Sequence, residues 1–141
     1  MNEKRQIGRG INILCNKIKR RIGKVSLEYG ISSMQAKILI FVFQESFKRD
    51  IFQRDIEEEF DIRRSSVTSV LTLMEKNKLI KRISFNEDAR LKKLILTDKG
   101  IGIYKSIFKE IEAIESIILE SLSVEEFDLL WELIQRLIKK M

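Results

Sequence analysis

The sequence predicts a mainly α-helical protein of one domain with one small β-hairpin. Its 141 residues suffice for a single hydrophobic core, and 44% of them are hydrophobic and 34% charged. Proline is absent, which favours uninterrupted helices. Most apolar residues repeat at helical spacing, whereas residues 79–97 alternate with the period of two that is typical of strands.

The first predicted helix covers about residues 5–30 and has one apolar face. Apolar side chains fall at intervals of three and four residues, at Ile7, Ile11, Leu14, Ile18, Ile22 and Val25. A second helix is predicted within ISSMQAKILIFVFQ, where Ser32 and Gln35 have the spacing of a capping box. This helix is apolar on almost every side, so we expect it to be buried.

Two more helices are predicted before the strands. RDIEEEFDI supplies a short helix, and RRSSVTSVLTLMEKNKL supplies a longer one with apolar residues at helical period, namely Val67, Val70, Leu71 and Met74. This period leaves small polar side chains on the exposed faces, namely Ser65, Ser66, Ser69 and Thr72.

The β-hairpin is predicted in LIKRISF and LKKLILT. Apolar residues keep a period of two in both segments, at Ile83, Phe85, Leu94 and Leu96. The residues between the segments favour a turn, and these are Asn86, Glu87 and Asp88.

Two long helices are predicted after the hairpin. Thr97 is the predicted cap of the first, whose apolar face carries Ile103, Ile107, Ile111, Ile114 and Ile118. Ser123 and Glu126 form a second predicted capping box. This box opens a last helix with its apolar face at Phe127, Leu130, Ile134 and Leu137.

Two short helices followed by a β-hairpin are the parts of a winged helix-turn-helix, here about residues 32–97. The outer helices, about 5–30 and 98–141, are longer than that unit needs and carry apolar faces that require a partner. Because opposite ends of one chain can pair with the same ends of its twin, we expect an all-α dimerisation region and a homodimer.

Charge is distributed unevenly along the chain, which has a net charge of +6. Residues 1–49 hold eleven Lys/Arg against three Glu, whereas residues 98–141 hold six Lys/Arg against nine Asp/Glu. A basic front third fits a polyanion such as double-stranded DNA, although a merely solvated charged surface has the same counts.

Several classes of protein are disfavoured. No apolar run approaches the roughly 20 residues that span a bilayer, and MNEKRQIGRG lacks a signal-peptide core, so we expect a cytoplasmic protein without membrane contact. Cys15 is the only cysteine and histidine is absent. An intrachain disulfide, a His-ligated zinc site and a His-based triad are thereby excluded, and we expect no enzyme, cofactor or metal.

The candidate DNA-binding residues lie in two segments. A recognition helix must present short polar side chains and cations to base edges, and RRSSVTS offers Arg63, Arg64, Ser65, Ser66, Thr68 and Ser69. The hairpin adds Asp88, Arg90 and Lys92, where the carboxylate can orient the neighbouring guanidinium for a minor groove. The alternatives are serines that merely cap a helix and an exposed ion pair with no function.

The run from Ile51 to Gly100 resembles the MarR (multiple antibiotic resistance regulator) family. The resemblance rests on the Ser/Thr-rich helix that ends in LTLMEKNKLIKR, on D-x-R in the wing, and on LILTDKG before the next helix. Upstream, the family's second-helix entry is similar to Ile31, Ser32, Gln35 and Leu39, so the likeness covers nearly the whole chain.

The resemblance implies a homodimeric DNA-binding repressor or activator, often with a small-molecule effector. The family's wing arginine matches Arg90, and its orienting aspartate matches Asp88. Lys78 stands where glycine usually ends the recognition helix, and Asn77 is our candidate for the left-handed cap. We expect a repressor that binds a pseudo-palindromic duplex; the alternative is a winged-helix protein-interaction module without DNA binding.

A set of aromatic residues and the single cysteine could serve either a function or the packing of the core. Aromatic residues are candidates to line a crevice for a small aromatic or apolar effector, or else belong to the core; they are Tyr29, Phe41, Phe43, Tyr104 and Phe108. Cys15 is similar in position to the oxidised cysteine of the family's organic-hydroperoxide sensors. Because Leu14 and Ile18 flank it on the apolar face, we expect it to be buried and inert.

Overall fold

The computed structural model describes residues 6–85 and 87–141, with side chains at all of these positions except 88 and 89. These residues form six helices and one antiparallel hairpin, which confirms the predicted fold class. The elements in chain order are α1 (Ile7–Glu28), α2 (Ser33–Glu45), α3 (Gln53–Phe60), α4 (Arg64–Lys76), β1 (Ile80–Phe85), β2 (Asp88–Leu96), α5 (Asp98–Ser121) and α6 (Val124–Lys140).

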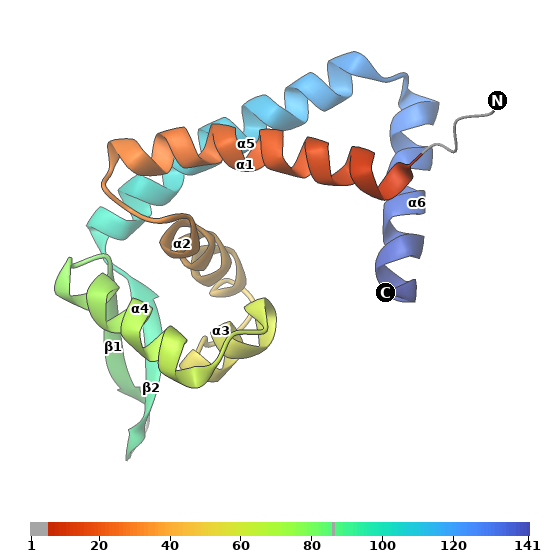
Figure 1. Cartoon of the computed structure of the whole chain (residues 1–141). Coiled ribbons are helices and arrows are strands. Elements are labelled where there is room, and N and C mark those ends of the chain that lie inside the picture. Colours follow the sequence, from red (N-terminus) through yellow and green to blue (C-terminus); the bar gives the residue numbers. More distant parts are fainter. Residues whose placement is uncertain (1–5, 86) are drawn as a thin grey trace.

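The chain forms an arch with a winged-helix part at one end (Figure 1). Helices α1 and α5 lie side by side along the top of the arch, and α2 packs against both. Below them, α2, α3, α4 and the hairpin make up the winged-helix part, from which the hairpin tip projects. Helix α6 descends from the far end of α5, separated from the winged-helix part by an open space.

The core lies where α2, α4, the hairpin and the first half of α5 meet. Its fully buried side chains from these elements include Leu39, Val42, Val67, Leu71, Met74, Ile80, Leu94 and Ile107, and Ile56 of α3 also contributes. The periods read from the sequence place these residues on the inner faces of their elements. The predicted burial of α2 and the exposure of Ser65, Ser66, Ser69 and Thr72 are both confirmed.

The predicted helix caps are confirmed at all three places. The Ser32 hydroxyl accepts from the Gln35 backbone N–H at 3.1 Å, and the Gln35 side chain accepts from the Ser32 N–H at 2.9 Å. Ser123 and Glu126 form the same reciprocal pair with distances of 2.9 and 3.1 Å. The Thr97 hydroxyl accepts from the Gly100 N–H at 3.1 Å. These short-range signals correctly place the starts of α2, α5 and α6.

The end of α4 differs from the prediction, because Lys78 and not Asn77 takes the left-handed conformation. Asn77 has φ −81°, whereas Lys78 has φ +60°. The Leu79 N–H donates to the Met74 carbonyl at 2.9 Å, and the Lys78 N–H donates to the Glu75 carbonyl at 3.0 Å. This pair of bonds is a Schellman motif, in which the residue after the cap must be left-handed.

Gly100 lies where the start of α5 meets the end of the α4–β1 connection. A Cβ atom at this position would lie 2.2 Å from the Leu79 carbonyl oxygen, far inside van der Waals contact. The Leu79 carbonyl is already held by the Thr97 backbone N–H at 3.1 Å. Glycine is therefore required by close approach of two backbone segments.

The hairpin tip also differs in part from the prediction. Glu87 lies in the turn as expected, but Asp88 is the first residue of β2 and pairs with Phe85. The turn assignment of Asp88 is therefore wrong, because the register shifts between Ser84 and Phe85 and lets β2 begin earlier. The prediction for Asn86 lies outside the described residues.

The outer helices expose much of their apolar faces. Ile7, Ile11 and Leu14 of α1 are 62%, 53% and 55% exposed, and α6 has no buried residue. Only the second half of the α1 face, at Ile22 and Val25, packs against the core. No helix in the described part of the chain is both long and apolar enough to cross a membrane.

Candidate nucleic-acid interface

All the polar residues predicted at the start of helix α4 are exposed. Its inner side is held by the buried side chains of Val67, Leu71 and Met74. The exposed residues of its N-cap and first two turns are Arg63, Arg64, Ser65, Ser66, Thr68 and Ser69. The helix is thus anchored by its apolar stripe while its first two turns remain accessible to a ligand.

Some hydroxyls on α4 make hydrogen bonds within the chain, and others do not. Thr68 Oγ1 donates to the Arg64 carbonyl at 2.8 Å and accepts from Gln53 Nε2 at 2.7 Å. Ser69 Oγ donates to the Ser65 carbonyl at 3.1 Å. The hydroxyls of Ser65 and Ser66 make no hydrogen bond to the described residues, so they have the fullest capacity for an external acceptor or donor.

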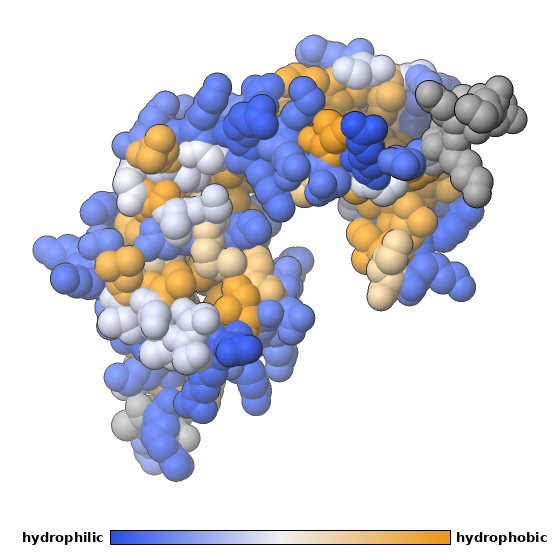
Figure 2. Space-filling view, in the orientation of Figure 1, coloured by the Kyte–Doolittle hydropathy of each residue, from blue (hydrophilic) through white to orange (hydrophobic). Residues whose placement is uncertain are grey.

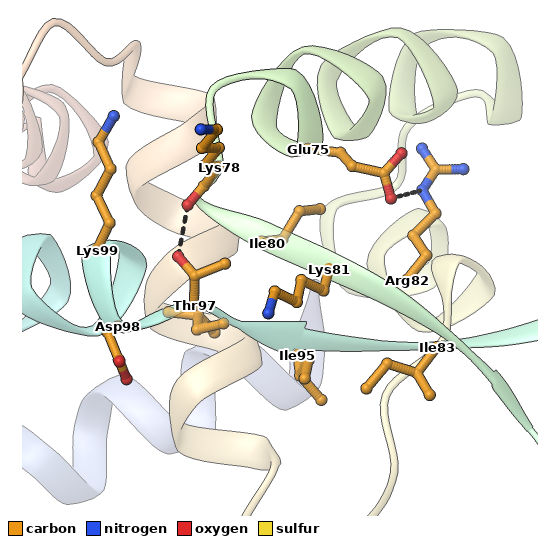
Figure 3. Close-up of a pocket in the computed structure, with 11 residues that line it drawn as sticks. Glu75, Lys78, Ile80, Lys81, Arg82, Ile83, Ile95, Thr97, Asp98 and Lys99 are labelled. Atoms are coloured by element: carbon orange, nitrogen blue, oxygen red, sulfur yellow. Dashed lines mark hydrogen bonds and ion pairs between the residues drawn. The ribbon is translucent and has the colours of Figure 1, made fainter.

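The wing is fixed to α4 through Arg82 of β1. Arg82 Nη2 donates to Thr72 Oγ1 at 3.3 Å, and its Nε lies 3.9 Å from Glu75 Oε2, an ion pair drawn in Figure 3. The Nε atom is buried and has no hydrogen-bond partner among the described residues. Arg82 therefore joins the hairpin to α4 through a hydrogen bond and an ion pair.

The base of the wing is tied to the end of α4 and the start of α5 around a shallow hollow of about 770 Å³. In Figure 3 the Thr97 hydroxyl donates to the Lys78 carbonyl, at 2.5 Å. Lys99 Nζ donates to the Asn77 carbonyl at 3.1 Å. These bonds satisfy carbonyls at the helix end and set the direction in which the hairpin leaves the body.

On its other side, the wing is tied to the connection between α2 and α3. The Leu94 N–H donates to the Ile51 carbonyl at 2.7 Å, and Lys93 Nζ lies 2.8 Å from Asp50 Oδ1. In the same connection Arg49 Nη1 donates to Asp55 Oδ1 at 2.8 Å, and this bond raises the pKa of the Arg49 guanidinium. The wing is therefore held along two sides of its base.

The two predicted DNA-binding segments line one open hollow of about 750 Å³. Arg64 and Thr68 come from α4, and Arg90 and Lys92 come from β2. The hollow is strongly cationic, because its lining includes five cations and one carboxylate: Arg54, Arg64, Arg82, Arg90, Lys92 and Glu57. Figure 2 shows hydrophilic atoms over the hairpin tip. The pairing predicted for Asp88 and Arg90 rests on a side chain outside the description.

Two residues of this surface were missed by the sequence reasoning. Gln53 and Arg54 open α3, and both line the hollow between α4 and the wing. Their position depends on how α3 crosses α4, a tertiary relationship that a period or motif does not encode. The sequence did contain one indication of this position, because Gln53 and Arg54 are adjacent polar residues in the first turn of the predicted third helix.

The five aromatic residues predicted for an effector crevice fall into separate contacts. Phe43 stacks on Tyr104 with ring centroids 3.9 Å apart, and Tyr104 stacks on Phe108 at 5.6 Å. Phe41 instead contacts Phe60 edge to face at 5.8 Å. The Tyr29 hydroxyl is hydrogen-bonded to the Ser106 hydroxyl at 2.7 Å. Three rings of the predicted set therefore join α2 to α5, and the effector stays a prediction.

Cys15 is exposed in the chain, so the expectation of burial on the apolar face is wrong. Leu14, its neighbour, is itself 55% exposed, because the first half of α1 extends beyond the core. The predicted inertness of the thiol toward oxidants remains a prediction.

No protein-family model matches the sequence, and a search of curated proteins finds no significant match. Among solved structures, the transcription regulator MarR from Oenococcus oeni PSU-1 is 28% identical, with a TM-score of 0.75 over 95% of this chain and 99% of that one. The chain has the winged-helix fold of this MarR protein. The predicted resemblance is confirmed.

Other MarR-type structures show the same fold at lower identity. S. aureus MepR in its DNA-binding conformation is 19% identical, with a TM-score of 0.84 over 96% of this chain and 98% of that one. A crystal structure of the S. aureus MepR–DNA complex is 20% identical, with a TM-score of 0.79 over 92% of this chain and 93% of that one. In this chain, residues of α4 and of the wing line one hollow of that shared fold.

Proposed function

We propose that this chain is a homodimeric transcriptional regulator that binds a pseudo-palindromic DNA duplex and acts as a repressor. The observation that carries the proposal is the cationic hollow, in which Arg64 of α4 and Arg90 of the wing line the same surface. Five cations against one carboxylate match a phosphate backbone. The likeness to the DNA-bound MepR structure supports the same conclusion.

Each part of the surface has a distinct role in this proposal. The exposed start of α4 enters the major groove, where arginine can bond guanine bidentately and the serine hydroxyls can bond bases or phosphates. Arg90 enters the flanking minor groove, where the narrow walls concentrate negative potential. A two-fold dimer places its two recognition helices about 34 Å apart, one helical turn of DNA.

An effector completes the proposed cycle. A small aromatic or apolar molecule acts at the stacked rings of Phe43, Tyr104 and Phe108, since these join α2 of the winged-helix part to α5. Binding there changes the angle between the winged-helix part and α5 and lowers the affinity for DNA. The direct test adds small aromatic ligands to the protein–DNA complex. A ligand that acts at this site should quench tyrosine fluorescence and release the duplex over the same concentration range, and a Tyr104→Leu variant should lose both effects.

The decisive experiment is a salt titration with duplexes selected from random DNA. If several phosphates are neutralised, log K falls linearly with log[salt], by roughly 0.9 per contact. Selection reports the half-site and its spacing at the same time. A flat titration, or failure to select any duplex, would favour the alternative of a winged-helix protein-interaction module.

A further inference from the structure

Strand β1 has a free edge, whereas β2 is covered along both of its edges. Among the described residues, β1 pairs with β2 only, and Phe52 of the α2–α3 connection forms a bridge to Lys93 on the other side of β2. In Figure 1, β1 is accordingly the strand on the outer side of the hairpin, away from α3. A free strand edge carries unpaired backbone N–H and C=O groups, which can bind the backbone of another extended chain.

The hydrogen-bond pattern of the hairpin determines which backbone groups of β1 face outward. The Leu94 N–H donates to the Ile51 carbonyl, so the backbone of Leu94 points away from β1. Leu94 lies opposite Arg82 in the register, and in such a non-hydrogen-bonded pair the backbone groups of both residues point outward. Because this orientation alternates along a strand, Ile80 and Ser84 also face outward. Ile80 is buried, so the accessible outward groups belong to Arg82 and Ser84.

The shallow hollow at the base of the wing runs along this free edge. Its lining includes four consecutive residues of β1, 80–83, and successive strand residues point to opposite faces. A hollow that contacts both faces passes along an edge of the strand, and the other edge of β1 is covered by β2. Ile83, which is 45% exposed, and Ile95 add apolar surface to the lining. Unpaired backbone groups and an apolar floor therefore lie together.

The charge around this hollow is mainly positive. Arg82 and Glu75 form an ion pair, so the remaining lining charges are three exposed lysines and one carboxylate. Two copies of this edge would bring like charges together, which disfavours pairing of the edge with itself. An acidic chain meets no such repulsion. The charged residues that line the hollow are Lys78, Lys81, Arg82, Lys99, Glu75 and Asp98.

We propose that the free edge of β1 is a docking site for an extended, acidic segment of another protein. The segment adds a strand to the hairpin and exchanges hydrogen bonds with the backbone of Arg82 and Ser84. An apolar side chain of the segment covers Ile83, and its carboxylates meet the lysines. The lining of this hollow shares only Arg82 with the hollow proposed to bind DNA. The inference therefore goes beyond the proposed function and does not depend on it.

Amide exchange in the full-length chain tests the docking site. The probe is a soluble peptide rich in valine and glutamate, and NMR of the isotope-labelled chain follows each amide. With the peptide at saturation, the Arg82 and Ser84 amides should exchange at least about three-fold more slowly, because their N–H groups become bonded. The Ile83 amide, which faces β2, should not change. The same peptide N-methylated at alternate residues keeps its side chains and charges but cannot pair with a strand, so it should give no protection.

Two variants separate backbone pairing from charge. Ser84→Pro removes an outward N–H that the ladder with β2 does not use, and Lys81→Glu reverses one charge of the hollow without changing the backbone. Each should weaken peptide binding at least about three-fold. The matched control is Lys105→Glu, which makes the same charge change at an exposed position of α5 outside the hollow and should bind the peptide as wild type does.

Several results would overturn the inference. Unchanged exchange at Arg82 and Ser84, equal protection by the N-methylated peptide, or equal binding by wild type and Lys81→Glu would each reject the docking site. Protection that appears without peptide as the protein concentration rises would assign the edge to a second copy. Protection by duplex DNA would assign it to nucleic acid. A chain that binds duplex while the peptide protects nothing rejects the docking site and leaves the proposed function intact.

Discussion

The side-chain amide of Gln53 donates a 2.7 Å hydrogen bond to the hydroxyl of Thr68 and so joins α3 to the exposed start of α4. Because Thr68 also donates to the Arg64 carbonyl, its hydroxyl is held in one orientation before any ligand arrives. The surface proposed to bind DNA is therefore partly ordered in advance, which would lower the entropic cost of that binding.

The first prediction concerns this bond. Gln53→Ala and Thr68→Val should each lower the free energy of unfolding by about 0.5–1.5 kcal/mol, the net value of one hydrogen bond. The double variant should lose less than the sum of the two, since both single changes remove the same contact. Urea unfolding measures all three, and strictly additive losses would show that the two side chains are independent.

The second prediction concerns the wing. Arg90→Ala should weaken binding to the selected duplex by about 1–3 kcal/mol without lowering the Tm, because Arg90 is exposed. Asp88→Ala should cause a smaller loss if its carboxylate orients the guanidinium. Lys109→Ala, an exposed change on α5, serves as the control in the same fluorescence anisotropy titration. Equal affinity for wild type and Arg90→Ala would remove the wing from the mechanism.

The third prediction compares two glycines of α5. Gly100→Ala should destabilise the fold by about 1–3 kcal/mol, because the added Cβ would lie 2.2 Å from the Leu79 carbonyl oxygen. Gly102→Ala has no neighbour within 4 Å and should instead stabilise the helix by about 0.5–1 kcal/mol. Thermal unfolding of the two variants should therefore shift in opposite directions. A shared direction would contradict the close approach.

The fourth prediction is a pH dependence at the start of α6. The hydrogen bond from the Ser123 backbone N–H lowers the pKa of Glu126 below its usual value of 4.5. A carboxyl with a lowered folded-state pKa stabilises the fold above its unfolded pKa and loses this effect as the pH falls through the folded value. Between pH 7 and pH 3, the Tm of wild type should fall further than that of Glu126→Gln. Parallel curves would show that the cap does not depend on charge.

The sequence allowed accurate prediction where structure depends on neighbours along the chain. The capping boxes at Ser32 and Ser123 and the buried face of α4 follow from spacings of three and four residues. The start of α3 as part of the interface did not follow, because Gln53 meets Thr68 only when two helices cross. The left-handed position was predicted at Asn77 instead of Lys78, because local sequence does not fix the exact residue at which a helix ends; here Leu79 is buried directly after that end.

The sequence likewise predicted some features of the candidate site and not others. The predicted polar residues at the start of α4 are exposed, and Arg64 and Arg90 line one hollow, whereas their contact with DNA stays a prediction. Burial of Cys15 was predicted from its apolar neighbours, yet a helical stripe specifies only which face is apolar and not what covers it. The first half of α1 has no such cover in the described part of the chain.

Helix α5 runs unbroken for 24 residues from the base of the wing to the turn before α6. At 1.5 Å per residue it is about 36 Å long, and Gly100 fixes its first turn against the hairpin. It therefore behaves as a stiff lever: a tilt of about 5° at one end displaces the other by about 3 Å, close to the rise of one base pair. In the proposed dimer, a small adjustment where the two chains meet would therefore be enough to shift the wing by about one base pair relative to the DNA.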